Sequence, residues 1–168
     1  MYNAKYHEEN EELDDELFQQ FVSDTKIFTD YKRNEKYSSI DYSATDIKGR
    51  RCAVELKRRF NKMYDFPTVF LENEKGWLMY NRWLQFGLIP LYLVFYDDGM
   101  LMFDLRKIKH PETEFVYRKV TIINKGYDEY QQVYRIELPT DIATLYKKVK
   151  GKWTWVKTED KDIITKNN

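Results

Sequence analysis

The sequence has little of what several common kinds of site require. Its 168 residues include one cysteine, Cys52, which excludes an internal disulfide and a cysteine-ligated zinc or iron–sulfur site. No apolar run approaches the roughly 18 residues of a transmembrane helix, and the acidic N-terminus lacks the basic and apolar regions of a signal peptide. Internal repeats and low-complexity linkers are also missing. We therefore expect a cytoplasmic protein with no membrane association.

The sequence also lacks net charge. Its 28 lysines and arginines balance 28 aspartates and glutamates, so the net charge gives no reason to expect nucleic-acid binding. The charges are unevenly distributed, because residues 8–16 are strongly acidic and a basic cluster follows later in the chain. This cluster either neutralises phosphates or only solubilises the ends of strands. Its members are Lys48, Arg50, Arg51, Lys57, Arg58, Arg59 and Lys62.

The size and composition favour one folded domain. With 42% hydrophobic and 17% aromatic side chains, the chain is long and apolar enough to bury a core. We expect a single domain over residues 1–168, with flexible ends at residues 1–9 and about 157–168.

Hydrophobic periodicity predicts an alternation of helices and strands. Leu13, Leu17 and Phe21, at four-residue spacing, indicate an amphipathic helix from Glu11 to about Lys26, and a polar loop is expected near residues 32–36. The near-continuous apolar run 89–96 is typical of a buried central strand. The other expected elements are strands at 37–44 and 52–57, a helix over much of 68–86, strands at 100–105, 114–123 and 132–138, and a short helix from 141 to about 149.

Two of these strands bring acidic side chains together. In the second strand, Glu55 and Lys57 share one face because side chains alternate with period two. If the hairpin between the strands is centred on Lys48, Asp41 lies seven residues before the centre and Glu55 seven after it. The two carboxylates then form an opposed cross-strand pair, which is repulsive unless a cation binds between them.

This set of side chains suits metal-dependent phosphodiester chemistry. Mg²⁺ prefers oxygen ligands, commonly one or two carboxylates completed by water and substrate phosphate. A nearby ammonium such as that of Lys57 can orient the attacking water or stabilise negative charge as it develops. The alternative interpretation is an ordinary solvated hairpin face that carries a glutamate–lysine pair.

On these residues the chain resembles the PD-(D/E)XK nuclease superfamily, over roughly residues 10 to 105. The resemblance implies an α/β fold with a restriction-endonuclease-like core, in which helices flank a central mixed sheet; here a C-terminal β-hairpin and a short helix are added. It implies that Asp41 and Glu55 bind Mg²⁺ or Mn²⁺ and that Lys57 is catalytic. One departure from the pattern is Ile40, which stands where a proline often precedes the first aspartate.

The resemblance also implies roles for residues outside the hairpin. A glutamate of the first helix sometimes completes the metal site, and Glu16 is the best candidate, with Glu12 one turn earlier. Lys75 either contacts a phosphate or belongs to a surface pair on its helix. The partner would be duplex or branched DNA, bound with the help of the arginines on both sides of the metal pair, which are Arg50, Arg51, Arg58 and Arg59.

The leading hypothesis is therefore a metal-dependent endo- or exodeoxyribonuclease, with a homodimer as one arrangement. Its compact form resembles phage or mobile-element nucleases. A second hypothesis is a non-catalytic module on the same fold that binds nucleic acid or protein. A third is a structural protein that interacts through its aromatic C-terminal region. There, Trp153 and Trp155 could stack on bases, although an edge strand that packs its aromatic side chains on the core fits the pattern better.

Overall fold

A computed structural model describes residues 4–35, 38–108, 113–122 and 127–157, with side-chain surroundings for residues 11–35, 38–108 and 135–157. Within these ranges the chain forms two α-helices, α1 (Ala4–Thr25) and α2 (Asn73–Phe86), and two sheets. No helix of the described part is both long and apolar enough to cross a bilayer.

The larger sheet is mixed and has seven strands in the order β1-β2-β3-β5-β6-β9-β10. The strands β3 and β5 run parallel and all other neighbours are antiparallel. A parallel pair needs a crossover connection, and α2 lies in this one. The strands are β1 (Phe28–Arg33), β2 (Tyr42–Asp46), β3 (Arg51–Arg58), β5 (Ile89–Tyr96), β6 (Gly99–Asp104), β9 (Thr144–Val149) and β10 (Lys152–Trp155).

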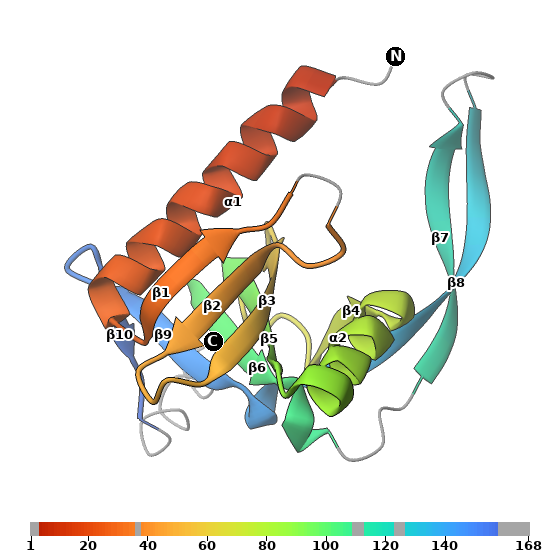
Figure 1. Ribbon diagram of the computed structural model, residues 1–168. Coiled ribbons are helices and arrows are strands. Elements are labelled where there is room, and N and C mark those ends of the chain that lie inside the picture. The colour runs from red at the N-terminus through yellow and green to blue at the C-terminus, as the bar shows by residue number, and fades with distance from the viewer. Residues whose placement is uncertain (1–3, 36–37, 109–112, 123–126, 158–168) are drawn as a thin grey trace.

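The smaller sheet has three antiparallel strands in the order β4-β8-β7, namely β4 (Thr68–Glu72), β8 (Tyr127–Pro139) and β7 (Thr113–Ile122). Figure 1 shows α2 beside β4, and the hairpin of β7 and β8 extending away from the rest of the molecule. One turn of 3-10 helix follows β6 at Leu105–Lys107, and another follows β8 at Thr140–Ile142.

The large sheet is covered on both faces, because β3 and β5 are buried along almost their whole length. On one face, Val54 and Leu56 of β3 join the core cluster that contains Phe18 and Phe21 of α1. On the other face, Ala53 belongs to a cluster shared with α2 and the smaller sheet. The alternation of β3 therefore sends its even-numbered side chains towards α1 and its odd-numbered side chains towards α2.

The α/β class, the central mixed sheet and its flanking helices confirm the predicted fold. The hairpin register is also the predicted one, because Tyr42 pairs with Val54 and the next step of the same register sets Asp41 opposite Glu55. The added hairpin is formed by β7 and β8. As expected, β10 is an edge strand and its Trp153 packs in the core, whereas Trp155 is 55% exposed against the expectation.

Several elements differ from the predictions, among them the strand expected at 37–44, which is β2 and begins only at Tyr42. Helix α1 already begins at Ala4, so residues 4–9 are helical rather than flexible, while residues 158–168 lie outside the described part of the chain. The segment Phe28–Arg33, expected to lead into a loop, is the edge strand β1, of which only Phe28 is buried. The segment Thr68–Glu72 is strand β4 rather than the start of a helix, since Val69 and Leu71 alternate into the core. The helix expected at 141–149 is wrong, because Leu145 and Tyr146 are buried in a strand paired on both sides.

Candidate active site

The site lies where β2 begins and β3 approaches its end. Glu55 is 4% exposed and projects to the α2 side of the sheet. Asp41 immediately precedes β2, and its Oδ2 accepts a hydrogen bond from the backbone N–H of Leu56 across 2.7 Å. This bond fixes the Asp41 carboxylate against β3, beside Glu55. The structure therefore brings together Asp41 and Glu55, the two carboxylates that the sequence predicts to lie opposite each other.

Burial, followed by the negative charge of Asp41, raises the pKa of Glu55 from its usual value of 4.5 to about 7. The ammonium of Lys75 opposes this shift, because it pairs with Oε1 of Glu55. The other carboxylate oxygen, Oε2, is buried and has no hydrogen-bond partner. A buried acceptor without a partner is costly, so this position favours a cation.

Lys75 reaches the carboxylates from the first turn of α2. Burial lowers the pKa of Lys75, but the charge and hydrogen bond of Glu55, followed by the charges of Asp41 and Glu72, outweigh it and raise the pKa. The ammonium is therefore held in its charged form. The structure places this lysine against a carboxylate, rather than on the outer surface of its helix.

The carboxylate pair fits a divalent cation of the magnesium type. Among the residues whose side chains are described, no group of three or more histidine, cysteine, aspartate or glutamate side chains could form a closed metal cage. Two carboxylates are nevertheless the usual protein contribution to a Mg²⁺ site that is completed by water and phosphate. Asp41 and Glu55 provide this set, and the unpartnered Oε2 of Glu55 is the oxygen most in need of a ligand.

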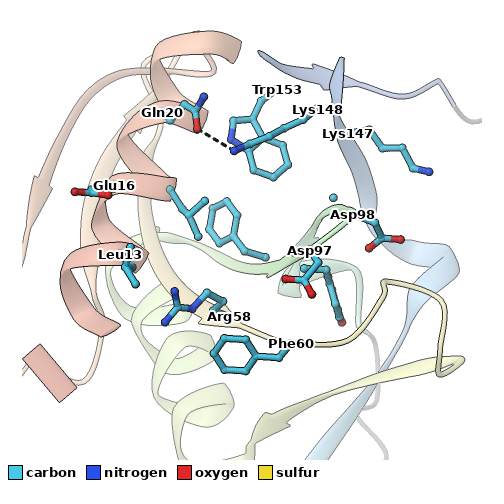
Figure 2. A pocket seen from close by; sticks show the side chains of 14 residues that line it. Leu13, Glu16, Gln20, Arg58, Phe60, Asp97, Asp98, Lys147, Lys148 and Trp153 are labelled. Atoms are coloured by element: carbon cyan, nitrogen blue, oxygen red, sulfur yellow. Dashed lines mark hydrogen bonds between the residues drawn. The ribbon is translucent and has the colours of Figure 1, made fainter. Parts of the chain in front are cut away.

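The carboxylate that α1 brings towards the pair is Asp14, not Glu16. Asp14 is half-buried, and its pKa is raised by burial against the opposing effect of Arg58 and Lys57, with Asp41 adding a further rise. Glu16 is exposed and lines a groove on the other side of Arg58. Figure 2 shows the Glu16 carboxylate directed away from Arg58 and from the middle of that groove.

The rotation of α1 explains this difference. The helix buries Phe18 and Phe21 completely, while Leu13, expected in the apolar stripe, is 45% exposed. The buried face of α1 therefore passes through positions 14, 18 and 21, rather than through the predicted positions 13, 17 and 21. Asp14 precedes Phe18 by four residues and so shares its face, whereas Glu16 does not. The spacing 14, 18 and 21 is the sequence signal that could have identified Asp14.

The groove beside α1 has a volume of about 540 Å³. Its walls come from α1, the end of β3, the turn between β5 and β6, and the hairpin of β9 and β10 (Figure 2). Lys148 bridges this hairpin to α1, because its Nζ donates to Oε1 of Gln20 across 3.0 Å. The charged groove residues are Glu16, Arg58, Asp97, Asp98, Lys147 and Lys148. Cations and anions balance here, so the groove does not resemble a phosphate channel.

Lys57 lies two residues after Glu55 on β3, with an exposed side chain. Its positive charge contributes to lowering the pKa of Asp14, which opposes the effect of burial there. Lys57 therefore lies near the end of β3, open to solvent and within electrostatic reach of the acid from α1.

The first two arginines are far from the carboxylates. Arg50 binds Asp46 within the hairpin turn, with its Nε donating across 2.7 Å, and the guanidinium of Arg51 donates to the carbonyl of Phe86 across 3.2 Å. Four residues of extended strand, or about 13 Å, separate Arg51 from Glu55. These two arginines have partners at the opposite end of β3.

The second two arginines lie at the same end of β3 as the carboxylates. Arg58 pairs with Asp14 across 3.2 Å, and its guanidinium lies over the ring of Phe60 at 5.1 Å from the centroid. Arg59 donates to the carbonyl of Phe70 across 3.3 Å. Of the four arginines predicted to contact phosphates, Arg58 and Arg59 are the two that the structure brings near the site.

Comparisons with known proteins give a weak structural likeness. No protein-family model matches the sequence, and no curated protein is similar to it. Among solved structures, the chain is similar to Hjc of Archaeoglobus fulgidus, a Holliday junction resolvase from an archaeal hyperthermophile. The two share 12% sequence identity with a TM-score of 0.45, over 76% of this chain and 80% of the resolvase.

Proposed function

We propose that the protein is a metal-dependent nuclease that hydrolyses phosphodiester bonds of DNA. The observation that carries this proposal is the opposed pair of Asp41 and Glu55, in which one buried oxygen, Oε2 of Glu55, lacks a partner. Two like charges held this close in a buried place are unfavourable, and a divalent cation converts the repulsion into binding energy. The proposed cofactor is Mg²⁺ or Mn²⁺.

In the proposed reaction, water attacks the phosphorus atom, the ester bond breaks, and the leaving oxygen takes a proton. The cation supplies Lewis-acid polarisation of the phosphoryl group and a more acidic water. Asp41 and Glu55 hold the cation through their carboxylate oxygens. Lys57 orients the attacking water or stabilises the developing negative charge with its ammonium. Asp14 takes the place expected of Glu16, as the carboxylate of α1 nearest to this group.

A second candidate function is a non-catalytic module that binds nucleic acid or protein on the same fold. The Lys75–Glu55 ion pair favours it, because a resident ammonium compensates the buried carboxylate in the absence of a metal ion. The two functions differ in one property, since only the nuclease requires divalent cations to bind at Asp41 and Glu55.

The experiment that tests the proposal incubates the protein with labelled linear, branched and single-stranded DNA and with RNA, in Mg²⁺, Mn²⁺ or EDTA. We expect DNA cleavage that needs the cation and is lost in the Asp41→Asn, Glu55→Gln double variant. Asp30→Asn is the matched control, because Asp30 is an exposed acid on β1. Calorimetry with Mn²⁺ on the same proteins separates the two candidates: equal binding by wild type and double variant would contradict the nuclease.

A further inference from the structure

The ammonium of Lys75 already occupies one of the two oxygens of Glu55, the carboxylate that would hold a cation through its other oxygen. It pairs with Oε1 of Glu55, whose side chain is 5% exposed, whereas the lysine side chain is 37% exposed. A buried carboxylate that loses its counter-charge is strongly destabilising, so this ion pair compensates Glu55 as long as no metal is bound. The lysine side chain that carries the compensating charge is therefore partly open to solvent.

We propose that Lys75 is an exchangeable counterion. It neutralises Glu55 in the metal-free protein, a divalent cation displaces it, and the released ammonium then contacts a phosphate of the substrate. The inference rests on the proposed function, because it assigns a role to a residue of the same site.

The balance of charges supports an exchange rather than simultaneous binding. Asp41 and Glu55 together carry two negative charges when ionised, which a divalent cation neutralises alone. An ammonium left against Glu55 would then be repelled by the ion. Lysine carries a compact charge on a flexible four-carbon stem, so Lys75 can turn outwards without movement of α2. With the cation bound, the site has one positive charge in excess, that of Lys75, which matches the single negative charge of a phosphodiester.

The surroundings of Lys75 limit the positions that the released ammonium can take. Besides Glu55, its acidic neighbours are Asp41 and Glu72, and both raise the pKa of its ammonium. Asp41 would bind the incoming cation and cease to attract the lysine. Glu72 is exposed at the start of α2, where water screens its charge. A substrate phosphate at the metal is therefore the strongest remaining partner.

Calorimetry with Mn²⁺ alone at pH 8.5 tests the displacement. Lys75→Met removes the competing charge, so we expect it to bind Mn²⁺ about tenfold more tightly than wild type, within the usual range of coupling between two ligands of one protein. Lys75→Arg keeps the charge and should bind like wild type. Lys152→Met, which removes an exposed lysine of β10, is the control for a general loss of positive charge.

DNA affinity across a salt series tests the phosphate contact. In Ca²⁺, Lys75→Met should lower the salt slope of binding by about one unit, and in EDTA it should leave the slope unchanged. An equal effect of Lys75→Met in Ca²⁺ and in EDTA would overturn the inference, because Lys75 would then contact DNA without exchange.

The wild-type protein provides a test that does not depend on the folding of a variant. Acetic anhydride modifies the neutral, accessible amine, so Mg²⁺ should increase the acetylation rate of Lys75 several-fold relative to Lys152, as measured by mass spectrometry. If wild type binds Mn²⁺ but Lys75→Met binds no more tightly and Lys75 stays protected, the inference falls and the proposed function stands. If neither wild type nor the Asp41→Asn, Glu55→Gln variant binds Mn²⁺, the proposed function falls as well.

Discussion

Asp41 is held against β3 by the backbone amide of Leu56, although it lies just outside the ladder of β2. The bond joins a side chain of one strand to the main chain of the next, so the carboxylate cannot turn away from its acidic neighbour Glu55. The repulsion between the two acids is therefore built into the hairpin. Its consequences can be measured separately from any cleavage activity.

The raised pKa of Glu55 makes stability depend on pH. Because its pKa is about 7 in the folded protein and usually 4.5, the folded state binds this proton more tightly than the unfolded chain does. The contribution is fully present below pH 4.5 and is lost as the pH rises to about 7, with a magnitude on the order of 3 kcal/mol. In EDTA, urea unfolding at pH 5 and pH 8 should show this loss in wild type and much less of it in Glu55→Gln. Identical pH profiles would contradict the burial of an ionisable Glu55.

Lys57→Met separates catalysis from metal binding. The change keeps most of the side-chain volume and removes the charge, so the cleavage rate should fall by about a hundredfold or more, as for the loss of one preorganised donor. Affinity for Mn²⁺ should change little, since the ammonium is not a metal ligand. Single-turnover cleavage combined with calorimetry measures both quantities. Unchanged cleavage would make Lys57 a solvated strand-end residue.

Substitutions of Asp14 and Glu16, two acids of α1, should affect Mn²⁺ binding differently. Asp14→Asn removes the α1 charge nearest the carboxylate pair and should weaken Mn²⁺ binding by about tenfold, in the range seen for partners of metal ligands. Glu16→Gln should have no effect, because its side chain is exposed and faces away from Arg58. Parallel titrations of the two variants decide between them. A larger loss of Mn²⁺ affinity in Glu16→Gln than in Asp14→Asn would support Glu16 as the metal ligand, as the sequence predicts.

Two arginines at opposite ends of β3 test the substrate surface. Arg58→Ser should lower the salt slope of DNA binding in Ca²⁺ by about one unit, and should weaken binding more at low salt than at high salt. Arg50→Ser is the matched variant, since Arg50 is bound to Asp46 in the hairpin turn. Melting curves of both variants check that the fold persists. If the two slopes coincide with that of wild type, the basic cluster is a solvated surface.

The hairpin was predictable from the sequence because its signals are local. The turn before Arg50, the period of two in β3 and the equal spacing of Asp41 and Glu55 all act within one short segment. The same local patterns identified β5, β6 and the hairpin of β7 and β8. The pairing of acids across the hairpin followed without any knowledge of the remaining fold.

Contacts between distant segments were not predictable in this way. Lys75 reaches Glu55 because α2 lies in the crossover between β3 and β5, and no pattern in the sequence specifies how far along β3 that helix passes. The local pattern of 141–149 predicts a helix, but pairing with β6 and β10 decides the conformation of β9 more than its own side chains do. Asp14 was overlooked because two apolar stripes compete on α1, and only packing decides which one is buried.

Because α1 is attached to the hairpin of β9 and β10, folding can be completed only late in synthesis. The backbone amide of Trp153 donates to Asp24 of α1 across 3.0 Å, and the two residues lie 129 positions apart. At a translation rate of about 5 to 20 residues per second, roughly ten seconds pass between the synthesis of the two partners. During that interval the apolar face of α1 lacks part of its cover, because Trp153 has not yet joined the core cluster of Phe18 and Phe21. The helix that carries Asp14 is thus fully docked only after β10 has emerged, so the candidate site is completed late in synthesis.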